Sequence, residues 1–319
     1  MKVDPGVFDP AAIDAETLAT IETIEGLLAE APPIHEQVPA EIRAARARGE
    51  GVLGSPVYLE GAETRQIPGP DGSVDLRIFR HDDPQGIYFH IHGGGWTLGS
   101  ADAQDPMLDA IRQAARATVV SIDYRLAPEN PYPAGPDDCE AAALWLVENA
   151  AAEFGALPLA IGGESAGAHL AAVTLLRLRD RHELQPFAAA NLVYGAYDLT
   201  LTPSVRSWGE RNLILSTPII EWFTRSFVPE ERARELPDIS PLKADLRGLP
   251  PALFTVGSMD PLLDDSLFMA ARWEAAGNAA ELVVYPGGIH GFNLFPNALG
   301  KRALAHAEGF LAAAFRSGD

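Results

Sequence analysis

The chain of 319 residues contains a single cysteine, Cys139, and lacks long uninterrupted runs of apolar residues. One thiol cannot form an internal disulfide framework or a thiolate metal cluster. A membrane-spanning helix needs about 18 consecutive apolar residues, and no stretch of the sequence provides them. The first residues, MKVDPGVFDP, contain acids and prolines where a signal peptide has a basic end and then an apolar segment. We therefore expect a cytoplasmic protein without membrane insertion.

Positive charge is also scarce. The chain has 24 Lys and Arg against 44 Asp and Glu, and its formal net charge is −20. Nucleic acids and anionic membrane surfaces are bound by clustered Lys and Arg, so this acid excess argues against both partners. We interpret it as a solubilising exterior. Hydrophobic residues make up 47% of the chain, which is enough for a sizeable core and excludes a disordered protein.

The middle and end of the chain alternate short apolar strands with helices, which is typical of a parallel sheet covered on both faces. A hairpin comes first, with residues 64–67 and 74–80 joined across the turn signal Pro68-Gly-Pro-Asp-Gly72. The strands that follow are predicted at residues 87–91, 118–122, 159–162, 189–194, 252–256 and 282–285. Helices are predicted near residues 102–116, 136–153, 166–180, 263–277 and 299–315.

Two segments do not fit this alternation. Residues 1–55 contain two predicted helices, at 11–30 and 40–48, with no strand before them, so we expect them to pack on a core formed later in the chain. Residues 198–248 contain many prolines and one helix around 217–227. They are too long for a loop, and we interpret them as an insertion that covers part of the molecule. The core is then formed by residues 56–197 and 249–319.

A serine between glycines stands where one predicted strand turns into a helix, in Gly163-Glu-Ser-Ala-Gly167. Such a sharp turn needs flanking glycines, because the neighbouring backbone leaves no room for side chains. The turn exposes the hydroxyl near a helix N-terminus, where backbone N–H groups favour negative charge. The sequence therefore predicts that Ser165 is a nucleophile. An ordinary N-capping serine in a tight turn is the alternative.

Three glycines follow the strand at residues 87–91, in His92-Gly-Gly-Gly-Trp96. They leave backbone N–H groups bare, as an oxyanion hole requires, and the N–H of Ala166 would add a further donor. The glycine spacing does not fit a phosphate-binding loop. No acid or cysteine cluster accompanies His90 and His92, so we reject a metal site and expect His92 to fix the loop by a hydrogen bond.

A serine nucleophile needs a base and an acid that orients it, and both are expected downstream of Ser165. Asp260 follows the strand at 252–256, and His290 follows the last strand in a glycine-rich loop. These two residues are the predicted acid and base. Asp264 and Asp265 fall at the start of the next helix, where we expect them to complement its dipole.

Together these motifs resemble the bacterial hormone-sensitive-lipase-like (family IV) carboxylesterases. The resemblance covers residues 57–315 and rests on HGGGW, GESAG, the stretch DYRLAPENPYPA at 123–134, DPLLDD and HGF. It implies an α/β-hydrolase fold with an eight-stranded, mostly parallel sheet, and a helical cap formed by the N-terminal helices and residues 198–248. It also implies hydrolysis of short- to medium-chain esters of small molecules without a cofactor, and a homodimer.

The resemblance implies roles for individual residues. Ser165, Asp260 and His290 become the catalytic triad, and Gly94, Gly95 and Ala166 become the oxyanion hole, with Gly93 as a further candidate. The family's usual elbow has Asp where this chain has Glu164. We expect this longer carboxylate to point away from the nucleophile and to reach loop or cap partners. Candidates for an apolar substrate pocket are Trp96, Tyr197, Trp208, Leu213, Leu215, Phe223, Ile289, Phe292 and Leu294.

Two other functions use the same residues. An amidase or peptidase would need the same triad, because Ser-His-Asp chemistry does not separate esters from activated amides. A non-catalytic small-molecule receptor on this fold would be expected to lack a member of the triad, whereas all three residues are present. Ester hydrolysis is the function that the sequence favours.

Overall fold

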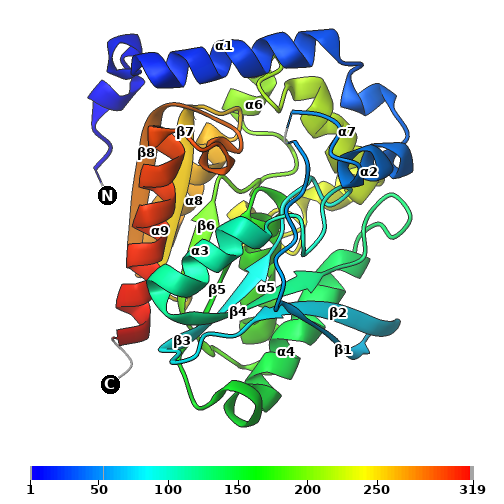
Figure 1. Cartoon of the computed structure of the whole chain (residues 1–319), viewed down its shortest axis with the longest axis vertical. Helices are drawn as coiled ribbons and strands as arrows, with labels where there is room; N and C mark the ends of the chain where they lie inside the picture. Colours follow the sequence, from blue (N-terminus) through cyan, green and yellow to red (C-terminus); the bar gives the residue numbers. More distant parts are fainter. Residues whose placement is uncertain (1, 53, 317–319) are drawn as a thin grey trace.

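A single eight-stranded sheet runs through the computed structural model, which describes residues 2–52 and 54–316 (Figure 1). Its strands are β1 (Glu63–Gly69), β2 (Gly72–Phe79), β3 (Gly86–Ile91), β4 (Ala117–Asp123), β5 (Leu159–Glu164), β6 (Phe187–Val193), β7 (Ala252–Met259) and β8 (Ala280–Ile289). The spatial order is β1-β2-β4-β3-β5-β6-β7-β8. The strands β1, β2 and β4 pair antiparallel, and every pairing from β4 to β8 is parallel. The predicted α/β-hydrolase sheet is confirmed.

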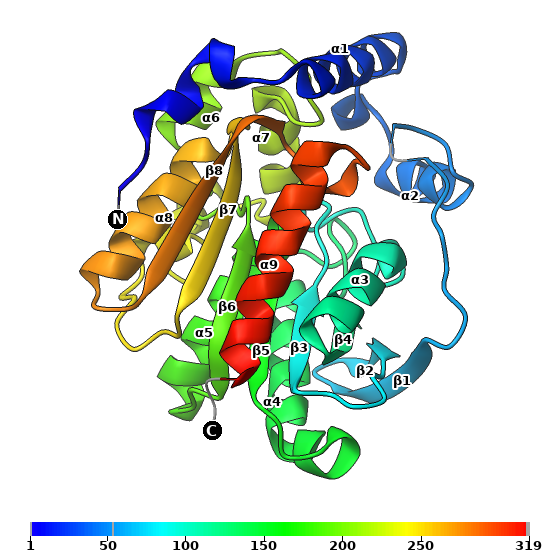
Figure 2. The same cartoon turned by 60° about the vertical axis from the view of Figure 1, so that its left-hand side comes forward.

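Helices cover both faces of this sheet, as Figure 2 shows. On one face lie α3 (Asp105–Ala115) and α9 (Ala298–Arg316), and on the other α4 (Ala134–Phe154), α5 (Ala166–His182) and α8 (Leu263–Ala275). The central strands β3 and β5 are buried along their whole length, which explains why apolar residues and glycine form most of them, apart from the paired His90 and Glu164. No helix among the described residues is long and apolar enough to cross a membrane.

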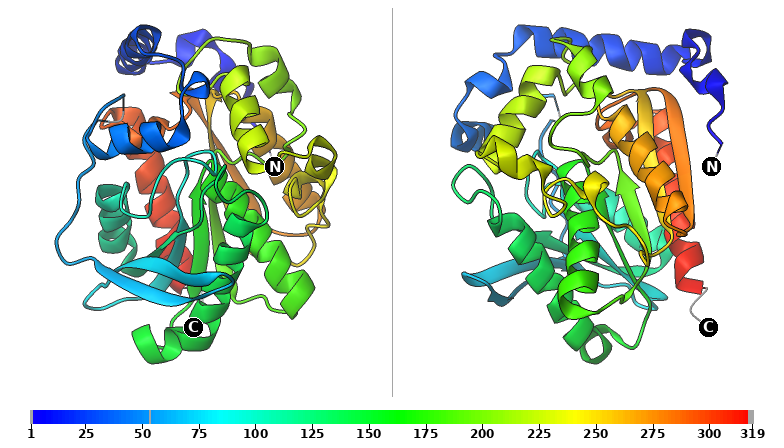
Figure 3. Two further views of the ribbon diagram at one scale, coloured as in Figure 1. Left: turned by 90° about the vertical axis from the view of Figure 1, so that its right-hand side faces the viewer. Right: turned by 180° about the vertical axis from the view of Figure 1, so that it is seen from behind.

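Four helices lie over the carboxyl ends of the parallel strands (Figure 3). They are α1 (Ala15–Glu30) and α2 (Pro39–Ala47) from the N-terminal segment, and α6 (Pro203–Trp208) and α7 (Thr217–Phe227) from the insertion. We call them the cap helices. The predicted helix at 11–30 begins only at Ala15, because the side chain of Asp14 accepts a hydrogen bond from Thr17 N–H at 2.8 Å and caps the helix there.

The position expected for Asp265 is confirmed, and its side chain also has a role that the sequence did not predict. It lies in the first turn of α8, as predicted, but its side chain is buried and is 1% exposed. One carboxylate oxygen accepts hydrogen bonds from the backbone N–H groups of Tyr197 and Asp198 at 2.6 and 2.9 Å. The other oxygen accepts from the hydroxyl of Thr202 at 2.6 Å. Asp265 therefore also fastens the start of the insertion to the core.

Replacing Asp265 by Ala removes the acceptor for two buried backbone N–H groups. An unsatisfied buried donor costs roughly 1–3 kcal/mol, so we expect Asp265→Ala to lower the free energy of unfolding by about 3 kcal/mol. Urea denaturation followed by circular dichroism measures this change. Asp245→Ala is the matched control, because Asp245 is exposed and pairs with Arg247 on the surface; it should unfold at the wild-type urea concentration. Equal midpoints for both variants would contradict the anchoring role.

Candidate active site

The serine turn is formed where the end of β5 passes close to the end of β3. A Cβ atom on Gly163 would lie 2.1 Å from the carbonyl oxygen of Ile91, and one on Gly167 would lie 1.9 Å from the same oxygen. Both positions therefore require glycine. Ser165 between them has φ +56°, in the left-handed region, and its N–H donates to the carbonyl of Val193 at 2.9 Å. This strained turn is typical of a nucleophile elbow.

The side chains of Ser165, His290 and Asp260 meet at this turn. His290 Nε2 lies 2.9 Å from Ser165 Oγ, and His290 Nδ1 lies 2.9 Å from Asp260 Oδ2. Asp260 follows β7 directly and His290 follows β8 directly, so both emerge at the carboxyl edge of the sheet. The Nδ1–H donates to the buried carboxylate, and Nε2 is left to accept from the serine hydroxyl.

Tyr194 packs against the imidazole of His290, and the sequence did not predict this contact. Its ring centroid lies 4.6 Å from that of His290, and its hydroxyl donates to Asn293 Oδ1. Burial raises the pKa of the Tyr194 phenol well above its usual value, so the group stays a donor. The only signal in the sequence was its position at the end of a predicted strand that leads to the same edge of the sheet.

The glycine loop lies beside the serine. A Cβ on Gly93 would approach Ser165 Cβ to 3.5 Å and the carbonyl oxygen of Glu164 to 2.7 Å. Gly94 and Gly95 have φ of +114° and +60°. Among the described residues, neither of their N–H groups donates a backbone hydrogen bond. Ala166 is the first residue of α5, where an N–H has no acceptor within the helix. Gly93 thus lies against Ser165, and the next two residues of the loop carry N–H groups without a backbone acceptor among the described residues.

His92 fixes this loop, as its sequence position suggested. Burial lowers the pKa of the His92 imidazole, and its Nδ1–H donates to the carbonyl of Gly93 at 2.7 Å. Its ring stacks on Tyr124 at a centroid distance of 4.2 Å. The Tyr124 hydroxyl in turn donates to the carbonyl of His92 at 3.0 Å. Both the ring and the backbone of this residue are therefore held.

The partners expected for Glu164 are wrong. The side chain is buried, and both carboxylate oxygens lie 3.1 Å from Nε2 of His90 on β3. His90 Nδ1 lies 2.9 Å from Ser121 Oγ on β4. Glu164 thus pairs within the sheet and not with a loop or the cap. Its side chain points to the face of the sheet opposite α5, the helix that follows the elbow. In the described part of the chain, no cluster of His, Cys, Asp and Glu fits a metal ion.

The structure distributes the predicted pocket residues over several places. The ring of Phe223 lies on the glycine loop, at the position that a Cβ of Gly95 would occupy, and Trp96 stacks on Phe227 at 4.8 Å. Trp208 lines an open hollow of about 330 Å³ that Asp260 also lines. The remaining candidates are buried in clusters of the hydrophobic core, apart from the partly exposed Leu294: Tyr197, Leu213, Leu215, Ile289 and Phe292. Only Trp96 and Phe223 are brought to the glycine loop.

Comparison with known proteins agrees with this geometry. A family model described as "alpha/beta hydrolase fold" matches residues 88–294. The carboxylic ester hydrolase LipN of Mycobacterium tuberculosis is 35% identical over 306 residues, which span 92% of this chain and 79% of that protein. The chain belongs to the hormone-sensitive-lipase-like carboxylesterase family of α/β-hydrolases.

Other members of this carboxylesterase family resemble the chain in sequence and in structure. The ethyl acetate hydrolase of Pseudomonas putida is 33% identical over 228 residues, covering 69% of this chain and 71% of that protein. The hyperthermophilic esterase of the archaeon Pyrobaculum calidifontis superposes with a TM-score of 0.85 at 28% identity, covering 98% of this chain and 99% of that one. The resemblance inferred from the motifs is confirmed.

The contact between Phe223 and Gly95 yields a prediction. A methyl group on residue 95 would lie 2.2 Å from an atom of the Phe223 ring, and φ of +60° disfavours any L side chain. Gly95→Ala should therefore displace the loop and lower kcat for p-nitrophenyl acetate by about 10²- to 10³-fold, the loss typical of a missing oxyanion donor. Gly309→Ala is the control, because its Cβ would meet open space on α9; wild-type kcat is expected. Full activity of Gly95→Ala would rule out this role for the loop.

Proposed function

We propose that the protein is a serine carboxylesterase that hydrolyses short- to medium-chain esters through Ser165, His290 and Asp260. One observation supports this proposal most strongly. The three side chains form a continuous series of hydrogen bonds, with both contacts at 2.9 Å, and Ser165 lies beside a glycine loop in which the N–H groups of Gly94 and Gly95 have no backbone acceptor among the described residues. A hydroxyl, a neutral imidazole and bare donors are the groups that acyl transfer needs in one place.

In the first half of the proposed reaction, the ester is attacked by serine. His290 Nε2 takes the proton of the Ser165 hydroxyl while the oxygen adds to the ester carbonyl. The carbonyl oxygen becomes negative, and the N–H groups of Gly94, Gly95 and Ala166 bind it. The tetrahedral intermediate collapses, the carbon–oxygen bond to the alcohol breaks, and the imidazolium gives its proton to the leaving alcohol. An acyl group remains on Ser165.

In the second half, water repeats the attack. His290 removes a proton from the water, the hydroxide adds to the acyl carbonyl, and the same N–H groups hold the new oxyanion. The acid then leaves and Ser165 regains its proton. Throughout, the buried Asp260 carboxylate keeps the proton of His290 on Nδ1 and stabilises the imidazolium that forms in each step. Tyr194 keeps the ring in this orientation by contact alone.

Two observations support a preference for small acyl groups. The ring of Phe223, from the cap helix α7, lies on Gly95 and narrows the space above the proposed oxyanion hole. The relative from Pseudomonas putida carries the name ethyl acetate hydrolase, which describes an ester of a two-carbon acid. A long acyl chain bound to Ser165 would have to displace this ring or pass around it.

Labelling tests the nucleophile. A fluorophosphonate reacts with an activated serine hydroxyl, so wild-type protein should be labelled at Ser165, as peptide mass spectrometry would show. Ser165→Ala should lose both the label and hydrolysis of p-nitrophenyl butyrate, while its circular dichroism spectrum stays unchanged. Ser73→Ala, at an exposed position of β2, is the control and should be labelled and active like the wild type. Esterase activity that survives in Ser165→Ala would refute the assignment.

A series of esters tests the acyl preference. We expect the wild type to reach its highest kcat/KM with one of three p-nitrophenyl esters, the acetate, the butyrate or the hexanoate. For p-nitrophenyl palmitate, kcat/KM should be at least tenfold lower. Phe223→Ala removes the ring above Gly95 and should move the optimum to longer chains. Phe268→Ala removes an exposed phenylalanine of α8 and should leave the profile unchanged. A wild-type optimum at palmitate would contradict the preference, and faster hydrolysis of the matching p-nitroanilides would favour an amidase.

A further inference from the structure

A buried histidine connects the glycine loop to the insertion. His169 lies on α5, and its N–H donates to the carbonyl of Ser165 at 3.1 Å, so it stands one helical turn after the nucleophile. The indole N–H of Trp96 donates to His169 Nδ1 at 3.0 Å. On the other side of the ring, Nε2–H donates to the carbonyl of Ile239 at 2.8 Å. The histidine is fully buried, and no part of the mechanism above uses it.

These two contacts allow only one form of the imidazole. The indole N–H of Trp96 is solely a donor and the Ile239 carbonyl is solely an acceptor, so Nδ1 must accept and Nε2 must carry the proton. A second proton on Nδ1 would point at the indole N–H and abolish that bond. Burial lowers the pKa of His169 to about 4, in agreement with a ring that stays neutral. His169 is therefore a directional link and not only a filler of the core.

Trp96 needs such a link because of its backbone. It ends the glycine loop, shares a peptide unit with Gly95, and has φ +58°, a left-handed conformation that is unfavourable for a residue with a side chain. Its ring is fixed by the His169 hydrogen bond and by stacking on Phe227 at the end of α7. Its carbonyl accepts from Ala127 N–H at 2.9 Å. If the indole ring moved, the peptide unit between Gly95 and Trp96, which ends the glycine loop, would turn with it.

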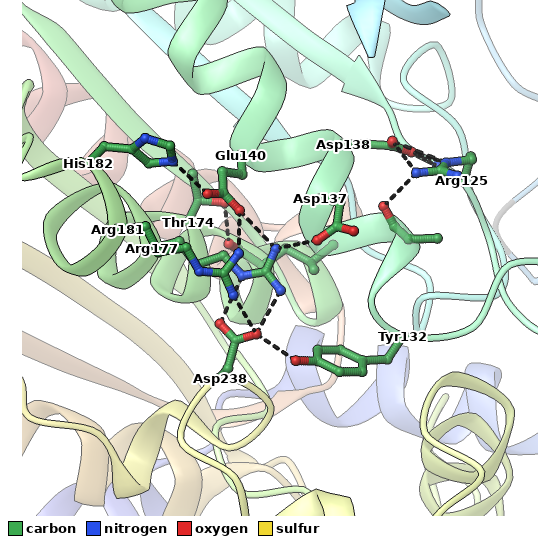
Figure 4. A network of polar contacts seen from close by, with 12 residues as sticks. Arg125, Tyr132, Asp137, Asp138, Glu140, Thr174, Arg177, Arg181, His182 and Asp238 are labelled. Atoms are coloured by element: carbon green, nitrogen blue, oxygen red, sulfur yellow. Dashed lines mark hydrogen bonds and ion pairs between the residues drawn. The ribbon is translucent and has the colours of Figure 1, made fainter. Parts of the chain in front are cut away.

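The other end of the link is held by a network of ion pairs, which Figure 4 shows. Asp238 precedes Ile239, and its two carboxylate oxygens accept from Nε and Nη2 of Arg177 at 2.8 and 2.6 Å. The Tyr132 hydroxyl donates to the same carboxylate at 2.6 Å. Arg177 is 2% exposed and also donates to Glu140 of α4 at 3.0 Å. The Ile239 carbonyl is thus presented to His169 from a fixed position.

We propose that His169 is a positioning residue that holds the oxyanion loop in its active geometry through Trp96, and that it takes its own position from Ile239 of the insertion. This proposal rests on the proposed esterase function. It makes the insertion part of the machinery that sets kcat, beyond its contact with the acyl group. A loss of the link should weaken binding of the transition state more than binding of the ester, because the oxyanion forms only after the attack.

Two substitutions separate the two arms of the link. In His169→Asn, the side-chain oxygen can take the place of Nδ1 and accept from Trp96, while the bond to Ile239 is lost. In His169→Gln, the longer amide can donate to Ile239, while the bond from Trp96 is lost. We expect His169→Gln to lower kcat for p-nitrophenyl butyrate by about 10- to 100-fold with KM nearly unchanged, as for a small misplacement of catalytic groups. His169→Asn should stay within a few-fold of the wild type.

Further measurements distinguish positioning from stability. The affinity for a trifluoromethyl ketone, which forms a tetrahedral adduct with the serine, should fall in His169→Gln by the same factor as kcat. Trp96→Phe removes the indole N–H and should act like His169→Gln, and the double variant should lose little more. Each rate is divided by the fraction of enzyme that reacts with the fluorophosphonate, so that unfolded protein does not lower the kcat obtained. His306→Gln on α9 is the control and should match the wild type.

The pH dependence of stability gives an independent readout. The pKa of His169 is lowered in the folded protein, so the unfolded chain binds a proton first and stability is lost as pH falls from about 6.5 towards 4. The charged groups that face His169 are Asp238 of the insertion, which raises this pKa, and Arg177 of α5, which lowers it; Trp96 and Phe227 bring none. The melting temperature of His169→Asn should therefore fall less steeply over this range than that of the wild type.

The proposal is overturned if His169→Gln and His169→Asn lower kcat equally, or if both keep wild-type kcat and only melt earlier. It is also overturned if KM rises in place of the fall in kcat. Failure of the proposed function would look different: wild-type protein would then show no hydrolysis and no label on Ser165, and the His169 variants would not be informative about catalysis.

Discussion

The contact between the carbonyl of Ile91 and the first turn of α5 determines the arrangement of the whole site. The two backbones approach so closely that neither Gly163 nor Gly167 could carry a Cβ atom. This approach places the elbow after β5 and the glycine loop after β3 side by side, although they lie far apart in the sequence. Ser165 then lies beside the glycine loop, and Asp260 and His290, which follow β7 and β8, reach it by hydrogen bonds. A larger residue at either glycine would separate the nucleophile from its proposed donors.

Local patterns in the sequence predicted the three side chains that meet in the proposed triad. Each of Ser165, Asp260 and His290 stands a few residues after a short apolar run and directly after the strand that the run forms, and parallel strands all end at the same edge of the sheet. The glycines around Ser165 could be interpreted without a structure, because a tight turn leaves few other residue types. The sheet followed from the alternation of strands and helices. Even the helix at 217–227 has the predicted limits, since Thr217 and Pro218 mark its start.

Contacts between distant residues were not predictable in this way. Asp265 looked like one of two acids in a first helical turn, and only the fold brings the N–H groups of Tyr197 and Asp198 to it. Glu164 was expected at a loop or the cap, yet its partner is His90 on the neighbouring strand β3, for which the sequence suggested only a metal-ligand role that was rejected. The aromatic residues of the insertion gave no signal that separates a substrate contact from core packing. Phe223 and Trp208 differ in the residues that they contact in the fold, whereas the sequence around each of them does not distinguish the two.

The insertion is fastened to the core at two separate points. Asp265 and its neighbours hold its start at residues 197–204, and the Arg177 network holds it again at Asp238. The chain between Ser204 and Asp238 carries α6 and α7 and spans the site between these anchors. We expect the interior of this segment to tolerate replacement, provided that both fastenings and the position of the Ile239 carbonyl are retained. The insertion could therefore vary while the residues of the site on the core stay the same.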